Sequence, residues 1–79
     1  MKNQPNKSNE DNLQLLGTII REIRLQLNIT QSDVSAATGL HINTISNIER
    51  GQSFRIDNLI IISCYYELKP SDILSVVGL

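Results

Sequence analysis

Apolar residues recur along most of the chain at steps of three and four, which is the period of an amphipathic helix. The longest stripe of this kind consists of Leu13, Leu16, Ile20, Ile23 and Leu27. This pattern predicts a first helix over residues 12–27, with Asp11 or Asn12 as its N-cap. Asn28 is expected to end the helix.

The next stretch predicts a short helix that begins at Thr30 and ends at Gly39. Thr30 and Asp33 have the spacing of a capping box, with Asp in the place of the usual Glu. Val34 and Ala37 form the expected apolar face of this helix. Glycine adopts a left-handed backbone conformation without steric penalty, so Gly39 is the expected stop.

A third helix is expected from Ile42 to Arg50, with Ile45 and Ile48 facing inward and Gly51 as its stop. A fourth spans residues 56–66. The residues available for burial on the fourth helix are Ile56, Leu59, Ile60, Ile62 and Ser63. A fifth covers residues 70–77, with proline at its first helical position. No strand pattern competes, so the chain is predicted to be all-α, a compact globule of five helices.

Composition adds boundaries and excludes several classes of protein. The first eleven residues have no apolar side chain after Met1, so residues 1–11 are expected to form a flexible arm and 12–79 one small domain. One cysteine, Cys64, and one histidine, His41, cannot form an intrachain disulfide and are too few for a zinc site. The longest apolar run is far shorter than the ~20 residues of a spanning helix, and no signal peptide is visible. A cytoplasmic protein is expected.

The spacing within residues 30–50 fits a helix-turn-helix, because two short helices are separated by a turn that contains glycine. The stretch TQSDVSAATGLHINTISNIERG resembles this motif in the lambda repressor/Cro/Xre family of bacterial and phage regulators. The upstream LGTIIREIRLQLNIT resembles the family's first helix, and ELKPSDIL resembles the entry to its last. The resemblance implies a lambda-repressor-like DNA-binding domain. The sequence departs from the family at Ser35, where alanine is usual, and in the loop GQSFRIDNL, which lacks the usual Asn-Pro.

The resemblance also implies a set of DNA contacts. The helix over residues 42–50 would enter the major groove, and Gln31 would contact a phosphate. The polar residues on the outer side of the recognition helix are Asn43, Thr44, Ser46 and Asn47. Asparagine can pair with adenine through two hydrogen bonds, whereas Thr44 is expected to contact the backbone. The expected phosphate contacts beyond the helix come from Arg50, Gln52 and Arg55. An ordinary solvated position is the alternative for Gln31 and for the four polar residues of the recognition helix.

Two residues at the start of the recognition helix have two interpretations each. His41 stands where the family often has a capping serine, so it either caps the helix or contacts a phosphate. Ile42 stands where a polar residue is common, and it either contacts a thymine methyl group or packs over the helix N-terminus.

Charge argues for caution about DNA binding. The chain has Lys+Arg 7 and Asp+Glu 8, whereas nucleic-acid binders usually have a basic excess. The resemblance implies that Arg24 and Glu49 form an internal ion pair between the first and third helices. Such a pair would remove Glu49 from the charge that faces DNA.

The sequence therefore predicts a sequence-specific transcriptional regulator whose partner is double-stranded DNA, with no enzymatic activity, cofactor, small-molecule ligand or membrane contact. A homodimer on a palindromic operator is expected, formed through the C-terminal helix and the tail SVVGL. Ile61 and Cys64, three residues apart on the fourth helix, are a second candidate surface. The alternative is a protein-binding adaptor or antitoxin-like module that uses the same fold.

Overall fold

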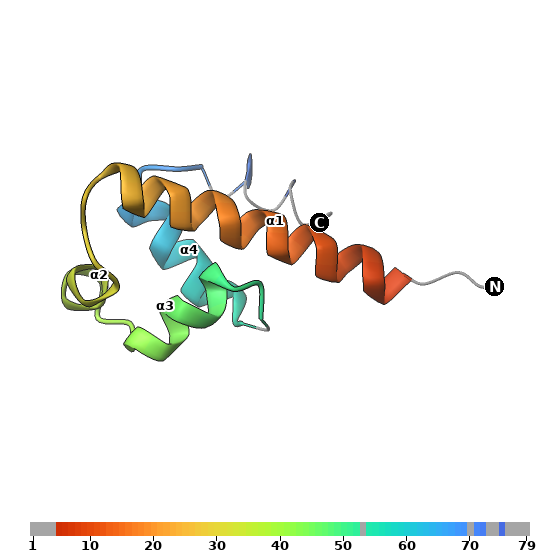
Figure 1. Ribbon diagram of the computed structural model, residues 1–79, viewed down its shortest axis with the longest axis horizontal. Coiled ribbons are helices and arrows are strands. Elements are labelled where there is room, and N and C mark those ends of the chain that lie inside the picture. Colours follow the sequence, from red (N-terminus) through yellow and green to blue (C-terminus); the bar gives the residue numbers. More distant parts are fainter. Residues whose placement is uncertain (1–4, 53, 70, 73–74, 76–79) are drawn as a thin grey trace.

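Four helices follow one another with short connections in the computed structural model of the protein. The structure describes residues 5–52, 54–69, 71–72 and 75, with side chains from Asn12 onward. The helices are α1 (Pro5–Gln26), α2 (Gln31–Thr38), α3 (Ile42–Glu49) and α4 (Ile56–Tyr65). No strand occurs in the described part of the chain, so the all-α prediction is confirmed there. Figure 1 shows α1 running along one side of the other helices, with its N-terminal end projecting beyond them.

The expected count of five helices is not matched, because four helices are found among the described residues. The fifth expected helix, over residues 70–77, falls mostly on positions outside them. The first helix begins at Pro5 instead of near Asn12, so the expected caps Asp11 and Asn12 lie within it. The other predicted boundaries agree within one or two residues with those of the structure.

The residues that end or begin the helices adopt the conformations expected of them. Asn28, two residues after the end of α1, has a left-handed backbone with φ 58°, and Gly39, directly after α2, has φ 79°. Gly51, which follows α3, has φ 75°. At the start of α2, the Thr30 hydroxyl accepts a hydrogen bond from the Asp33 backbone N–H at 3.0 Å, and the Asp33 carboxylate accepts one from the Thr30 N–H at 2.8 Å. The predicted capping box is therefore confirmed.

A small apolar core lies between the helices, where α1 and α2 pack against α3 and α2 also contacts α4. Its fully buried members are Leu16, Ile20, Val34, Ile45, Ile48, Leu59 and Ile62. The inward direction predicted for Ile45 and Ile48 is confirmed, since neither has an exposed surface. No helix among the described residues is long and apolar enough to cross a membrane.

Several apolar residues that the sequence placed inside are exposed. Leu27 is 56% exposed because α1 ends at Gln26, and the buried line of α1 runs through Leu16, Ile20 and Arg24 at four-residue steps. Ala37 is also exposed.

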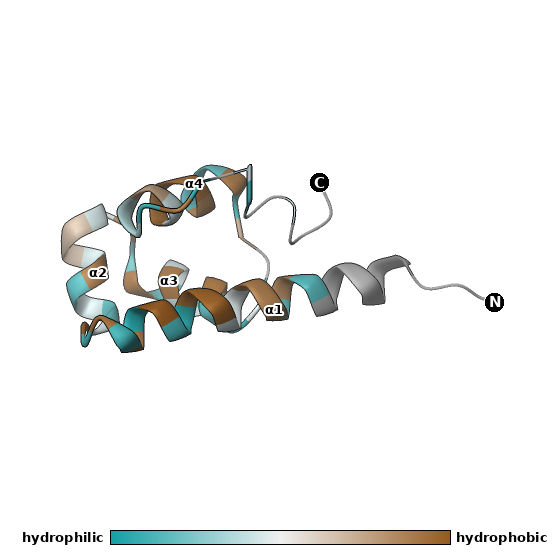
Figure 2. Cartoon of the chain, turned by 90° about the horizontal axis from the view of Figure 1, so that it is seen from above, coloured by the Kyte–Doolittle hydropathy of each residue, from teal (hydrophilic) through white to brown (hydrophobic). Residues whose placement is uncertain are grey.

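The fourth helix, the most apolar of the four (Figure 2), buries only one side. Leu59, Ile62 and Ser63 face the core, whereas Ile56 and Ile60 are 44% and 38% exposed. Ile60 lies about 100° around the helix from Leu59, which turns it away from the core. The expected burial of Ile56 and Ile60 was therefore wrong.

Candidate nucleic-acid interface

The turn between α2 and α3 is held by two hydroxyl groups of α2. The Ser35 hydroxyl donates to the Leu40 carbonyl oxygen at 2.6 Å. The Thr38 hydroxyl donates to the Val34 carbonyl at 2.7 Å and accepts from the Leu40 N–H at 3.2 Å. Serine at position 35 therefore does more than preserve the small volume of the usual alanine, because its hydroxyl fixes the turn that sets the direction of α3.

The buried pair of Arg24 and Glu49 fixes α3 from the other side. Arg24 donates from Nε to Glu49 Oε2 at 2.7 Å and from Nη2 to Glu49 Oε1 at 3.1 Å. Its Nη1 donates to the Ile29 carbonyl at 2.9 Å. The side chains are only 11% and 2% exposed, and the hydrogen bonds to the carboxylate raise the pKa of Arg24. This geometry agrees with the ion pair that the sequence suggested, and it keeps the Glu49 charge away from the surface.

Gln31 joins this network, although the sequence assigned it only a phosphate contact or a solvated position. Its Nε2 donates to Glu49 Oε1 at 3.0 Å, and its side chain is half-buried at the start of α2. Three helices thus converge on one carboxylate: α1 through Arg24, α2 through Gln31 and α3 through Glu49 itself. One N–H of the Gln31 amide is used in this way, which leaves the second available to another acceptor.

Close packing of α1 on α3 depends on a glycine that sequence patterning did not identify. A Cβ atom on Gly17 would lie 2.5 Å from the Ile48 carbonyl oxygen and 2.6 Å from that of Glu49. Only glycine allows the two backbones to approach this closely. The signal in the sequence was a glycine inside an otherwise regular helical pattern, next to the buried Leu16.

The outer side of α3 presents polar side chains at the surface. Asn43 is exposed, while Thr44, Ser46 and Asn47 are half-buried. His41 caps the helix, because its Nδ1 accepts a hydrogen bond from the Asn43 backbone N–H at 3.0 Å. Ile42, between these two residues, is 38% exposed.

Two arginines, Arg50 and Arg55, lie in the segment that connects α3 to α4, and both form hydrogen bonds with other side chains. Arg50 Nη2 donates to Asn47 Oδ1 at 2.8 Å. Arg55, at the N-cap of α4, donates to Asp57 at 3.1 and 3.2 Å. These hydrogen bonds lower the pKa of Asp57 and raise that of Arg55. Asp57 therefore offsets the Arg55 charge. Gln52 is exposed.

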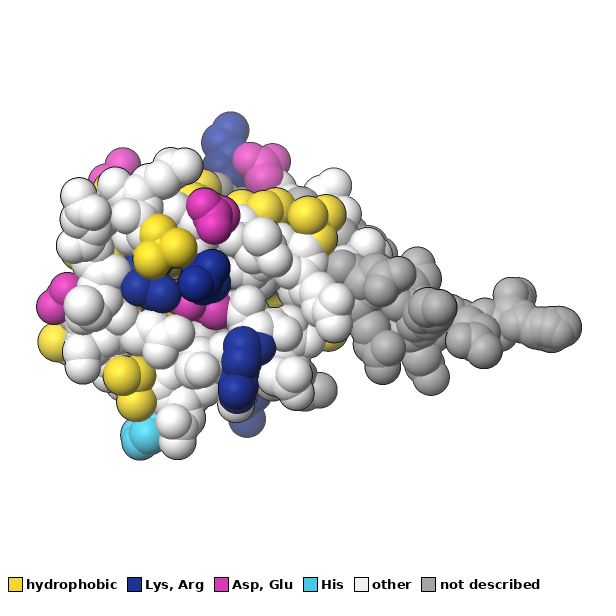
Figure 3. Space-filling view, in the orientation of Figure 1, with side chains coloured by type: hydrophobic (Ala, Val, Ile, Leu, Met, Phe, Trp, Pro, Cys, Tyr) yellow, Lys and Arg dark blue, Asp and Glu magenta, His cyan; other side chains and the backbone are white. Residues whose placement is uncertain are grey.

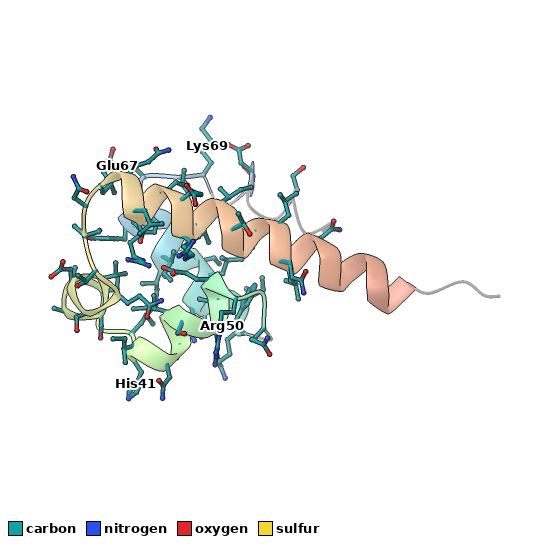
Figure 4. The ribbon with its side chains drawn as sticks, in the orientation of Figure 1. His41, Arg50, Glu67 and Lys69 are labelled. Atoms are coloured by element: carbon teal, nitrogen blue, oxygen red, sulfur yellow. The ribbon has the colours of Figure 1, made fainter. Side chains whose placement is uncertain are left out.

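The labelled side chains show which edge of the molecule these residues occupy. In Figure 4, His41 and Arg50 lie at the two ends of α3 on one edge, and Glu67 and Lys69 lie at the opposite edge. On the face shown in Figure 3, basic side chains are dispersed among acidic and neutral ones. The arrangement therefore offers DNA a projecting polar helix with few cations around it.

Comparison with family models gives a match that covers residues 20–73 and is described as helix-turn-helix. The matched segment makes up more than half of the chain and includes α2, the turn and α3. The chain belongs to the helix-turn-helix family of the Cro/Xre type. No curated protein and no solved structure matches the chain.

Membership in the Cro/Xre-type family means that the chain carries a DNA-binding domain of a generally non-enzymatic class. The helix-turn-helix motif consists of α2 and α3. Helix α1 packs against α3, and α4 packs against α2. No group of three or more His, Cys, Asp or Glu residues among those described is arranged to hold a metal ion.

Proposed function

We propose that the protein is a sequence-specific transcriptional regulator whose α3 enters the major groove of double-stranded DNA. The observation that carries this proposal is the two-sided character of α3. Ile45, Ile48 and Glu49 are at most 6% exposed and bind the helix to the core. On the other side, Asn43 is exposed and the polar residues Thr44, Ser46 and Asn47 are half-buried. A helix fixed on one side and polar on the other fits a groove about 12 Å wide.

On this proposal, Asn43 and Asn47 read base edges, with Thr44 and Ser46 contacting base edges or the sugar–phosphate backbone. Ile42, being 38% exposed next to the cap, contacts a thymine methyl group. His41, Gln31, Arg50, Gln52 and Arg55 contact phosphates. Gln31 does so with the amide N–H that Glu49 leaves unused.

We propose that two copies act together on a palindromic operator, because one recognition helix reads only a few base pairs. The C-terminal helix and tail are the first proposed interface. The outer side of α4 is the second, since Ile61 is 40% exposed and Cys64 is also exposed. Sedimentation of the whole chain tests this step, and a clean monomer at high micromolar concentration would remove the dimer.

Selection of bound sequences from random double-stranded DNA tests the function directly. A palindrome should be enriched, and binding to it should weaken as salt rises. Two arginine contacts per protomer predict a slope of log K against log salt of roughly −3 to −4 for a dimer. Arg50→Ala should weaken binding, and Lys69→Ala is its charge-matched control. Each substitution removes one cation, but Lys69 lies at the opposite edge of the molecule (Figure 4). Equal effects of the two substitutions would count against the proposed face.

A protein-binding adaptor or antitoxin-like role is the second candidate. It is favoured by the exposed apolar residues of α4 and by the net charge of −1. The absence of any enriched DNA sequence at low salt, together with a stoichiometric protein partner that Ile61→Glu releases, would favour this role over the first.

A further inference from the structure

The two asparagines of α3 differ in their hydrogen bonds. Asn47 Oδ1 accepts from Arg50 Nη2 at 2.8 Å. The Asn43 side chain is exposed and makes no hydrogen bond within the part of the chain that the structure describes. The hydrogen bond to His41 comes from the Asn43 backbone N–H. The two residues therefore do not present the same groups to a base.

Chemistry fixes which way round the Asn47 amide lies. A guanidinium has five N–H donors and no acceptor, so only the oxygen of the amide can face Arg50. The nitrogen, with its two N–H groups, occupies the other branch of the planar amide. Asn47 is also half-buried, which restricts rotation of its side chain away from this position.

This orientation changes which base Asn47 suits. The familiar pairing of asparagine with adenine needs an oxygen that accepts from N6 and a nitrogen that donates to N7. With its oxygen engaged by Arg50, Asn47 offers a base mainly its donors. Guanine presents two adjacent acceptors, O6 and N7, in the major groove, whereas adenine presents one acceptor beside a donor.

We infer that Arg50 is a positioning residue that holds Asn47 as a hydrogen-bond donor, so that the protein prefers guanine over adenine at the base pair facing Asn47. Asn43, whose amide is free, remains the residue suited to adenine. This inference rests on the proposed DNA-binding function and deepens it. Four N–H groups of Arg50 stay available, so the same guanidinium can also bind a phosphate.

Selection from random double-stranded DNA with four forms of the whole chain tests the inference: wild type, Asn47→Ala, Arg50→Ala and Arg50→Lys. Asn47→Ala identifies the base pair that Asn47 reads, because the preference there disappears. Wild type should prefer guanine over adenine at that pair by about tenfold, within the range of one specific base contact. Arg50→Ala should reverse or abolish this preference, since the freed oxygen can accept from adenine N6.

Arg50→Lys tests whether a cation that only donates is sufficient. A lysine ammonium has three N–H donors and no acceptor, so it also faces the oxygen of Asn47 and the guanine preference should remain. Affinity for all sequences should stay close to that of wild type, because the cation that contacts a phosphate is kept. Circular dichroism of each variant checks that it is folded, which is expected because Arg50 is exposed.

The possible failures are distinguishable. If wild type enriches no sequence, the proposed function fails and this inference fails with it. If wild type enriches an operator but shows adenine at the Asn47 pair, the inference alone is overturned. The same follows if Asn47→Ala changes no base preference, or if Arg50→Ala weakens all sequences equally and leaves the preference unchanged.

Discussion

Replacing Glu49 with glutamine should destabilise the fold strongly, because Glu49 is the buried partner of Arg24. The substitution keeps the shape of the side chain but leaves the Arg24 guanidinium, now without a counter-charge, in a site where the side chain is 11% exposed. Breaking a buried pair in this way costs about 3–5 kcal/mol. At about 0.05–0.15 kcal/mol per residue, the whole chain has roughly 4–12 kcal/mol of stability. Glu49→Gln is thus expected to remove about a quarter of it or more.

Urea denaturation followed by far-ultraviolet circular dichroism measures this loss. For a domain of this size the slope is about 1 kcal/mol/M, so the midpoint should fall by about 3 M or more. The matched control is Glu22→Gln, because Glu22 forms an exposed pair with Arg21 at 3.9 Å and its loss should cost less than about 1 kcal/mol.

A double substitution separates the pair from the charge left behind. Arg24→Met with Glu49→Leu removes both charges and fills the site with apolar side chains of similar volume, so its stability should return close to that of wild type or exceed it. A loss below about 1 kcal/mol for Glu49→Gln would mean that water screens the pair as it does at a surface. A double variant as unstable as the single one would show that packing, and not charge burial, explains the loss.

Three further outcomes are expected. Gly17→Ala should destabilise the fold by about 1–3 kcal/mol or more, because the new Cβ would clash with the Ile48 carbonyl oxygen. Gly39→Ala has open space around the new Cβ, so it should cost only the backbone strain of φ 79°, about 1–2 kcal/mol. Thermal melts in which Gly39→Ala is the less stable variant would contradict the close approach of α1 and α3. Burial raises the pKa of Tyr66 to about 12, so the free energy of unfolding should be unaffected by this group below pH 10 and should fall as pH rises from about 10 to 12. Tyr66→Phe should remove this alkaline loss. At neutral pH it should leave the free energy of unfolding equal or up to about 1 kcal/mol higher, because the buried hydroxyl has no partner among the described residues. Asp57→Asn should free Arg55 and raise DNA affinity several-fold at low salt in fluorescence anisotropy, and an unchanged or lower affinity would show that Arg55 does not face a phosphate.

Helix boundaries were predicted best where the residues that set them lie within one short stretch of the sequence. The capping box at Thr30 and the left-handed Gly39 bound α2 on both sides, and both act within a few residues. Boundaries were less certain where no such signal existed, as at Pro5, where the polar composition of the first residues favoured an arm instead of a helix.

The face of each helix could be predicted only in part. Periodicity identified Ile45 and Ile48 as buried, because they share one side of a short helix. It failed for Ile56 and Ile60, since the fourth helix is apolar on most sides and the sequence does not say which side meets the core.

The residues proposed to contact DNA were chosen by resemblance, and their partners could not be read from the sequence. Gln31 meets Glu49 across 18 positions of the chain, and Arg55 turns to Asp57, two residues away. Whether a side chain contacts a phosphate or such an internal partner depends on distances of a few ångströms. These distances cannot be obtained from the order of residues in the sequence.

The sequence by itself determined the all-helical class, the helix-turn-helix with its caps and turn, and membership in the Cro/Xre-type family, because these depend on residue type and on spacing within short segments. Tertiary structure decided that Gly17 brings α1 against α3, that one buried carboxylate joins three helices, and that Arg50 engages the oxygen of Asn47. The physical reason is that hydrogen bonds and steric contacts act over about 3 Å. Which groups come that close is settled only when the helices pack.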